Sequence, residues 1–521
     1  MKPHSPISPL SLGLRPVALA GLLVLAGCAV GPDFQPPTVN TPGHWVDVGE
    51  AANAAIESNL APSPITTVDW WTLFGDDKLN ELVRDAAAQN YTVLEAEARI
   101  RAARATIGVV KSGLFPSVSG SGSYNYGSGP HYIGDEPQES PPTTSWHSGL
   151  DAVWELDIFG GTRRATEAAQ ASLEVTIEDR RDTLVTLVAE VGADYIDLRS
   201  DQQLLQIAGK SLEDEQHTLK ITHDRWQAGL ASKLDYENAK SAADSTSAQI
   251  PTIETNIRTQ IYALSLLLGR DPGALLDELN VAAPRPKSPS QAPIGLPADL
   301  LRRRPDIREA EAQVHADTAN IGVAKAQYYP QFTLNGSFGF QGVSIGQMTQ
   351  WASQTWAWGP SINWPILAGG KLSAQVELAK ASLQADLFAY RNTVLTALNE
   401  VETALISFNK EQERRAALRD VVDDNQQAFN LSLQLYTQGQ AEFINVLNAE
   451  LSLASSQNSL EQSDAAVATD LIALFKALGG GWSEFPERDA LTLEYGDHPS
   501  QPPAAQSTNS PTPNGNVAAP Q

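Results

Sequence analysis

The stretch IGVVKSGLFP at residues 107–116 decides the fold, because it recurs as IGVAKAQYYP at residues 321–330. Three further matches follow in the same order: Trp154 to Gly161 with Trp364 to Gly370, Trp226 to Gly229 with Tyr436 to Gly439, and Ala263 to Gly269 with Ala473 to Gly479. Ordered matches at a nearly constant offset are the signature of an internal repeat. We therefore predict two structural repeats, each built as helix, two strands, long helix, turn and long helix.

The long helices of both halves carry a heptad pattern. In the first half, the apolar residues that fall every seven positions are Leu184, Val191, Leu198, Leu205, Leu212 and Leu219. In the second half, the matching series is Val394, Val401, Phe408, Arg415, Val422, Phe429 and Tyr436. A sustained period of 3.5 predicts coiled-coil helices, and an uninterrupted run of about 45 residues would be about 68 Å long. A long intramolecular bundle with no role in transport would show the same pattern.

After Pro116 and Pro330 the period of the apolar residues changes from 3.5 to 2. Four segments of about ten residues alternate in this way, which is the length of a transmembrane strand. A soluble two-sided sheet would also alternate. The residues that we expect to face lipid are Trp146, Trp154, Phe332, Phe338, Phe340, Trp356, Trp358 and Trp364.

Four strands cannot close a barrel. An open sheet in lipid leaves the backbone groups of its edges unpaired, at a cost of several kcal/mol each. Closure therefore requires several copies of the chain around a symmetry axis. Three copies would supply about twelve strands, whereas two would supply about eight and leave almost no aqueous lumen. This reasoning favours three or more copies without fixing the number.

The first 27 residues are typical of a lipoprotein signal peptide. Lys2 and Arg15 supply positive charge, and the apolar run from Val17 to Leu25 is too short to span a bilayer. It ends in LAGC, which resembles a lipobox, so we expect cleavage before Cys28 and a covalent lipid on that residue as the only bound group. Cys28 is the only cysteine. Ala29 follows it, and in lipoproteins this predicts the outer membrane.

Composition sets the remaining boundaries. We expect an extended acylated segment at 28–68, the first repeat at 69–280, a Pro-rich linker at 281–297, the second repeat at 298–483 and a disordered tail at 484–521. Beyond residue 28 no apolar run reaches about 18 residues, so entry into a membrane would require a β-barrel.

Charge and motifs exclude several classes of protein. The net charge of −25 argues against nucleic acid as a partner. Gly342 to Gly346 matches a nucleophile-elbow pattern, but the only later histidine is His498, in the expected tail. The eight histidines show no metal-binding spacing. We therefore predict no enzyme activity, no metal and no cofactor beyond the lipid.

Four motifs carry a family resemblance. LLRRRPDIR at 300–308, ALGGGW at 477–482, AGLAS at 228–232 and DWW at 69–71 resemble signatures of the NodT/OprM-like outer-membrane efflux lipoproteins, which are TolC relatives. The resemblance covers Cys28 to about Trp482, and in that family DWW begins an N-terminal helix.

The resemblance implies an α+β membrane protein. Its homotrimer would form a 12-strand transmembrane β-barrel, with four strands per chain, continued by a long periplasmic α-helical coiled-coil barrel and a small equatorial domain. It would lie in the outer membrane, lipid-anchored on the periplasmic side. As a passive exit duct for drugs or other small solutes, it would work with a periplasmic adaptor and an inner-membrane transporter of the RND class.

In TolC relatives, acidic residues ring the narrowest point of the periplasmic tips. The matching positions here are Asn445 and Asn448 in the second tip, and Asp235 and Asn238 in the first. Neutral amides cannot bind cations as carboxylates do. The resemblance therefore leaves Asp235 and Glu442 as candidates for charge at the entrance, although a solvated turn would carry such residues equally well.

Two alternatives remain open at this point. The same duct would serve a protein or peptide secretion system driven by an ABC exporter. A protein of a different class, a lipid-anchored coiled-coil scaffold, would carry the helices without inserting its strands into a membrane.

Overall fold

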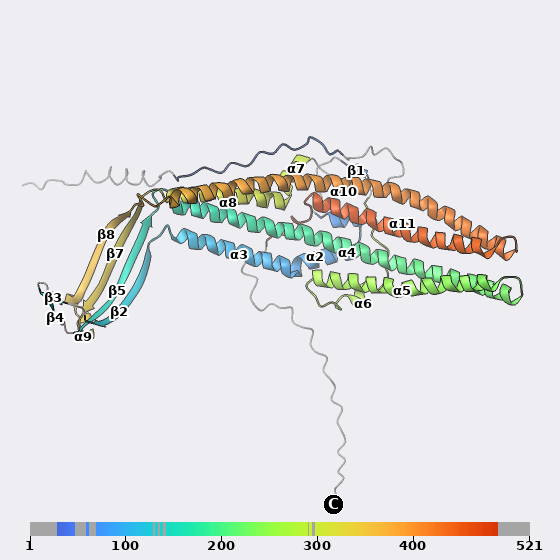
Figure 1. The fold of residues 1–521 in the computed structure, drawn as a ribbon, viewed down its shortest axis with the longest axis horizontal. Helices are drawn as coiled ribbons and strands as arrows, with labels where there is room; N and C mark the ends of the chain where they lie inside the picture. Colours follow the sequence, from blue (N-terminus) through green and yellow to red (C-terminus); the bar gives the residue numbers. More distant parts are fainter. Residues whose placement is uncertain are drawn as a thin grey trace, which may run out of the picture. The chain divides into compact units, whose positions relative to one another are not determined.

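A computed structural model of the chain describes residues 29–46, 59–61, 69–128, 131–133, 136–138, 142–289, 291–293 and 297–487. The chain divides into two compact units, Met1–Phe485 and Pro486–Gln521, and all elements described below belong to the first. In Figure 1 the helical elements are η1 (Trp70–Phe74), α2 (Asp77–Gln89), α3 (Tyr91–Ser112), α4 (Gly161–Gln227), α5 (Lys233–Leu267), α6 (Leu276–Leu279), α7 (Pro297–Arg303), α8 (Pro305–Ala326), α9 (Ile345–Met348), η2 (Trp351–Ser353), α10 (Lys371–Thr437) and α11 (Phe443–Ala477).

The two halves of this unit have matching elements. The helices α4 and α10 each have 67 residues, α5 and α11 each have 35, and α3 and α8 each have 22. A pair of long strands separates the short helix from the long one in each half. The predicted order of helix, two strands, long helix, turn and long helix is therefore confirmed.

The long helices exceed the expected 45 residues. At about 1.5 Å per residue, 67 residues extend for about 100 Å. The heptad weakens before Leu184, but no proline interrupts the chain from Gly161 to that point, and the helix continues back to the strands. Gly160 and Gly370, both with positive φ, precede the first residues of α4 and α10.

Four long strands form one antiparallel sheet in the order β2-β5-β7-β8. These strands are β2 (Ser117–Gly127), β5 (Thr143–Leu156), β7 (Gln331–Gly342) and β8 (Gln354–Asn363). The central pairing, β5 with β7, joins the two halves of the chain, and Leu150 lies opposite Phe338 there. Pro360 lies in β8, at one edge of the sheet, where a missing N–H donor is tolerated best.

Two small sheets complete the strands. β1 (Asn59–Ala61) pairs in parallel with β6 (Gln291–Pro293), and β3 (His131–Ile133) pairs with β4 (Glu136–Gln138). β6 lies inside the predicted linker, and the last residue of that linker, Pro297, is the first residue of α7. The linker is therefore only partly irregular.

The main core lies where α4, α10 and α11 meet the N-terminal helices. Trp70 and Trp71 of η1 are fully buried there, and Trp70 stacks on Phe475 of α11. The N-terminal helix expected after Asp69 is interrupted at Gly75, which has positive φ, so that it forms η1 and then α2.

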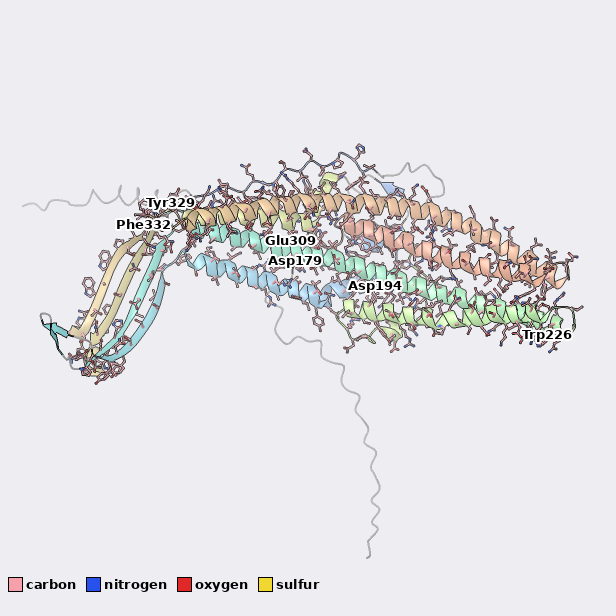
Figure 2. All side chains as sticks on the ribbon, in the orientation of Figure 1. Asp179, Asp194, Trp226, Glu309, Tyr329 and Phe332 are labelled. Atoms are coloured by element: carbon pink, nitrogen blue, oxygen red, sulfur yellow. The ribbon has the colours of Figure 1, made fainter. Side chains whose placement is uncertain are left out.

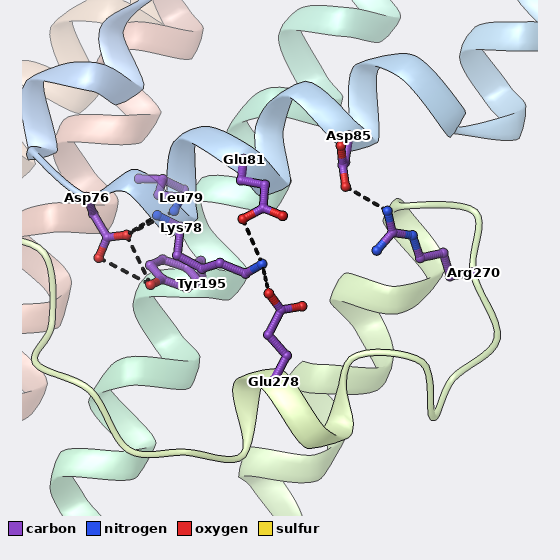
Figure 3. Close-up of polar contacts among 8 residues, drawn as sticks. All are labelled: Asp76, Lys78, Leu79, Glu81, Asp85, Tyr195, Arg270 and Glu278. Carbon is purple, nitrogen blue, oxygen red and sulfur yellow. Dashed lines mark hydrogen bonds and ion pairs between the residues drawn. The ribbon is translucent and has the colours of Figure 1, made fainter.

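Polar contacts fix α2 to α4 and to the segment after α5 (Figure 3). Asp76 accepts bonds from the first backbone amides of α2 and from the hydroxyl of Tyr195 on α4. Lys78 bridges Glu81 and Glu278, and Arg270 pairs with Asp85 at 2.6 Å. These contacts hold the N-terminal helix across the middle of the long helices.

In the part of the chain that the structure describes, no helix combines the length and the apolar character needed to cross a bilayer.

Candidate functional site

One side of the four-stranded sheet, called here the aromatic face, is mostly apolar along all four strands. Its polar members are Thr144, Ser148 and Gln354, and the pairing register places with them Val118, Gly120, Gly122, Tyr124, Tyr126, Trp146, Leu150, Ala152, Trp154, Leu156, Phe332, Leu334, Gly336, Phe338, Phe340, Gly342, Trp356, Trp358, Pro360 and Ile362. Residues paired across strands share a side of the sheet. All the predicted lipid-facing residues that lie within strands therefore share this face. Trp358 is 75% exposed, and no element of the described chain covers it.

The opposite side of the sheet is polar. Ser121 donates to Asp151 at 2.9 Å, and Asn335 donates to Ser361 at 3.0 Å. Serine, threonine, asparagine and glycine fill most of the remaining positions of this face. A sheet that separates an apolar medium from water needs one apolar face and one polar face.

Two tryptophans end the sheet at its junction with the helices. The indole N–H of Trp154 donates to the carbonyl of Leu114 at 3.0 Å. The indole N–H of Trp364, just after β8, donates to the carbonyl of Tyr328 at 3.1 Å. Each tryptophan therefore ties the last strand of its half to the turn before the first strand. Figure 2 marks this junction with Tyr329 and Phe332.

Residues 29–34, called here the strap, lie along the junction of α4 and α8. Val30 donates its amide to Phe159 at 3.1 Å and accepts a bond from Arg164. Arg164 also pairs with Asp33 at 2.6 Å, and its side chain is buried. Cys28, the predicted lipid attachment residue, lies outside the described residues, one position before this strap.

The strap crosses α8 at a point where both chain segments carry glycine. Gly31 has a φ of +111°, and a Cβ atom built on it would lie 2.5 Å from the Cα of Gly322. Three residues later, Phe34 stacks on His315 of α8 with ring centroids 4.3 Å apart. Apart from the repeated glycine of the IGV motif, no sequence pattern indicates this approach.

At the first hairpin tip, residues 228–232, the predicted residue Asp235 has a defined local partner. Ser232 accepts a bond from the amide of Asp235, whose carboxylate accepts one from the amide of Ser232, each at 3.1 Å. This capping box satisfies two helix-terminal amides of α5. Asn238 lies one turn further along the same helix and is half-buried.

At the second hairpin tip, residues 438–442, Glu442 takes the place of Ser232. It is exposed and is the N-cap residue of α11, but its side chain accepts no capping bond. Asn445 and Asn448 are exposed as well. The structure therefore places all five predicted tip residues at the ends of the hairpins, but Asp235 and Glu442 do not occupy matching positions.

Arg225 joins the two tips. Its guanidinium donates to the carbonyl of Thr437 at 3.2 Å and lies over the ring of Tyr436, 4.7 Å from the ring centre. Tyr436 in turn packs against Phe443, which is buried at the start of α11. Sequence reasoning missed this contact, because no local pattern relates residues on separate hairpins.

Two buried carboxyl groups face the interface between the hairpins. Glu450 of α11 accepts a bond from Thr218 of α4, and Glu215 of α4 accepts one from Thr246 of α5. Burial first, and then the charge of Glu215, raises the pKa of Glu450 to about 7. Burial also raises the pKa of Glu215. Spacing alone does not reveal such a pair.

An acidic stripe follows one side of α4, with Glu190, Asp194, Asp197 and Asp201 three or four residues apart. Burial, and then the neighbouring acids, raise the pKa of Asp194, labelled in Figure 2, to about 6. Burial, and then the charge of Asp197, raise the pKa of Asp201 to about 6. The charge of this stripe therefore changes just below neutral pH.

Comparisons with known proteins assign the family of the chain. The family model described as outer membrane efflux protein matches residues 82–270 and again residues 296–480. Nodulation protein T of Rhizobium leguminosarum bv. trifolii is 30% identical over 462 residues, covering 88% of this chain and 96% of that protein. Toluene efflux pump outer membrane protein TtgC of Pseudomonas putida is 30% identical, covering 88% of this chain and 94% of that protein.

Solved structures of the same kind share the fold. The outer-membrane channel OprN is 32% identical, with a TM-score of 0.80, and the match covers 87% of this chain and all of that one. CusC is 26% identical, with a TM-score of 0.76 and the same coverage.

Proposed function

The chain belongs to the outer membrane efflux protein family and is the outer-membrane channel component of an efflux pump, and from this premise we propose that three copies form its passive duct. Each copy would contribute four strands to a 12-strand barrel and two hairpins to a helical barrel in the periplasm. The duct would perform no chemistry of its own.

The two-sided sheet carries this proposal. Its aromatic face needs an apolar medium, and its polar face needs water. Its outer strands, β2 and β8, would leave unpaired backbone groups in lipid, at several kcal/mol each. Pairing β8 of one copy with β2 of the next satisfies these groups and encloses the polar face around a bore.

Two measurements test the duct. Protein extracted from membranes should migrate on gels as a trimer that heating converts to a monomer, and it should conduct ions across planar bilayers. A heat-insensitive monomer without conductance would contradict the duct and favour a lipid-anchored scaffold.

We also propose that Cys28 carries a covalent lipid and that this lipid inserts into the outer membrane from the periplasmic side. The strap supports this placement, because it holds residue 29 beside the junction of sheet and helices. Mass spectrometry of the mature N-terminus should find an acylated cysteine. An unmodified residue 28 in the membrane-extracted protein would contradict the proposal.

The partners in this proposal are a periplasmic adaptor, which would dock at the hairpin tips, and an inner-membrane transporter of the RND class. The names of relatives such as the toluene efflux pump protein support small solutes as the cargo. Photocrosslinkers at Leu230, which is exposed at the first tip, should capture an adaptor in intact cells. Capture of an ABC exporter complex instead would favour peptide or protein secretion.

We propose Asp235 and Glu442 as the charged groups at the entrance of the duct. Replacing Asp235 with asparagine should lower the cation preference of single channels in bilayers. Replacing Asp244, further from the tip on the same helix, is the matched control. Unchanged selectivity in the Asp235→Asn variant would contradict its place in the bore.

A further inference from the structure

The loop between β8 and α10, residues 364–370, is called here the second elbow. It exposes apolar side chains at the junction of sheet and helices. Ile366 is 83% exposed and Leu367 is 94% exposed, and no described element of the chain covers them. Trp364, which begins the loop, is 56% exposed although its indole N–H is bonded to Tyr328. Such exposure is costly in water, at about 25 cal/mol per Å² of apolar surface.

The matching segment of the first half, residues 154–160, is called here the first elbow; it comprises the end of β5 and the loop before α4, and its contacts differ from those of the second elbow. Phe159 stacks on Tyr329 with ring centroids 4.5 Å apart, and its carbonyl accepts the amide of Val30 from the strap. Asp157 accepts the first amides of α4 and pairs with Arg163 at 3.2 Å. In the first elbow, Asp157 therefore caps α4 and pairs with Arg163, and the strap bonds to Phe159.

The apolar surface of the second elbow continues that of the aromatic face. Trp356, Trp358 and Ile362 share the aromatic face of β8, and Trp364 and Ile366 follow at the same spacing of two residues just past the end of the strand. Residues 364–370 carry no charge, and the first charge after them is the cation Lys371. A tryptophan, bulky aliphatic residues and a flanking lysine are the combination that favours the interface of a phospholipid bilayer.

We propose that the second elbow inserts Ile366 and Leu367 into the headgroup and acyl boundary of the membrane. It is a protein-built anchor for the half of the chain that has no lipid of its own. The first half is held by the strap and the lipid on Cys28. The occupant of the second elbow is therefore phospholipid. This inference rests on the proposed placement of the aromatic face in a membrane, and the experiment below separates the two.

The test places one fluorescent thiol label at a time on the full-length chain in vesicles of phosphatidylethanolamine and phosphatidylglycerol. Leu367→Cys probes the second elbow, Trp358→Cys probes the aromatic face, and Leu234→Cys, exposed at the first tip, serves as the control in water. The chain without an added cysteine is treated with the same label, and its fluorescence shows how much label reacts with Cys28. Quenching by spin-labelled lipid and by aqueous iodide is measured for each position.

The inference expects lipid to quench the label at residue 367 as strongly as at residue 358, and iodide to quench only residue 234. Lipid quenching at 358 with iodide quenching at 367 would overturn the inference and leave the proposed duct intact. Protection of 367 from both quenchers would also overturn it, because a second copy of the chain would then cover the loop. Iodide quenching at 358 with lipid quenching at 367 would support the elbow anchor and contradict the membrane sheet. Iodide quenching at both positions would overturn both.

Discussion

The first hairpin tip, residues 228–232, and the second, residues 438–442, turn the chain along the same backbone path with different side chains. Gly229 and Gly439 have φ values of +76° and +74°, and each follows a helix of the same length. The residue after each glycine donates its amide to a carbonyl at a distance of 2.8 or 2.9 Å. Because glycine and helix length set the path, the remaining side chains are free to differ.

The chemistry of the two tips differs accordingly. The first is stabilised by its own capping box and carries Trp226 stacked on Tyr236 at 5.3 Å. The second has no side-chain cap and relies on Phe443 in a small buried cluster and on Arg225 from the first hairpin. The first tip is therefore stabilised locally, whereas the second depends on its neighbour.

The largest effect is expected for Phe443→Ala. Removing a fully buried aromatic ring costs about 3–5 kcal/mol, and here the cost falls on the opening of the second tip. Hydrogen exchange of residues 439–447 should accelerate accordingly, while exchange at the first tip stays unchanged. Ile444→Ala, at an exposed position beside it, is the control. Equal acceleration at both tips would refute the difference between them.

The buried carboxyl pair of Glu215 and Glu450 predicts that the stability of the folded chain depends on pH. Lys240 occupies the position in α5 that Glu450 has in α11, and it lies in solvent. The pKa of Glu450 is raised from 4.5 to about 7 in the folded chain, so its contribution to stability is complete below about pH 4.5. Above about pH 4.5 the unfolded chain releases the proton that the folded chain still holds, so this contribution falls. It is lost as the pH rises through about 7, where the folded chain releases the proton as well.

Glu450→Gln should therefore raise the melting temperature at pH 8 and change it little at pH 5. The difference corresponds to roughly 1–3 kcal/mol. Thermal melts of the detergent-extracted protein at both pH values measure it, with exposed Glu442→Gln as the control. An identical shift at pH 5 and pH 8 would show that no proton is held at Glu450.

Arg225→Met should release the second tip from the first. It removes a charged hydrogen bond and a cation–π contact, worth together about 1–3 kcal/mol, while it keeps much of the side-chain length. Hydrogen exchange should rise at residues 436–446 and much less at 228–236. Arg258→Met, on α5 and away from the tips, is the matched control. A larger rise at the first tip would reverse the proposed dependence.

The smallest loss of stability is expected from changes to the N-cap residues of α5 and α11. Ser232→Ala should destabilise the start of α5 by about 1 kcal/mol, because the amide of Asp235 loses the hydroxyl that accepts its hydrogen bond. Glu442→Ala, at the matching position, should cost no more than a few tenths, since no capping bond is lost. Local exchange rates at 233–236 and 443–446 measure both. Equal costs would show that the caps are equivalent.

Much of the fold was predictable because its signals are local and periodic. The change from a period of 3.5 to a period of 2 at Pro116 and Pro330 located all four strands of the main sheet, and their register confirms the shared side of the aromatic residues. Helix length was underestimated, because the heptad seam is shorter than the helix that contains it. No helix breaker stands between Gly161 and Leu184, and α4 is packed there through residues outside the heptad, such as Ala168 and Ala171.

Contacts between distant segments were not predictable. The strand at Gln291–Pro293 lies among prolines and pairs with only three residues near position 60. Arg225 and Glu450 look like ordinary surface residues of long helices until the hairpins are placed side by side. The positions of the tip residues could be located from the sequence, and the spacing of Ser232 and Asp235 is itself the local signature of a capping box.

The crossing of Gly31 over Gly322 has a consequence for the order of assembly. The strap contacts α4 from the first half and α8 from the second, and Arg164 of α4 bonds to it beside Gly322 of α8. Before the two halves have packed together, the strap lacks the surface that binds it. A bound strap would thus indicate that α4 and α8 have already packed against each other.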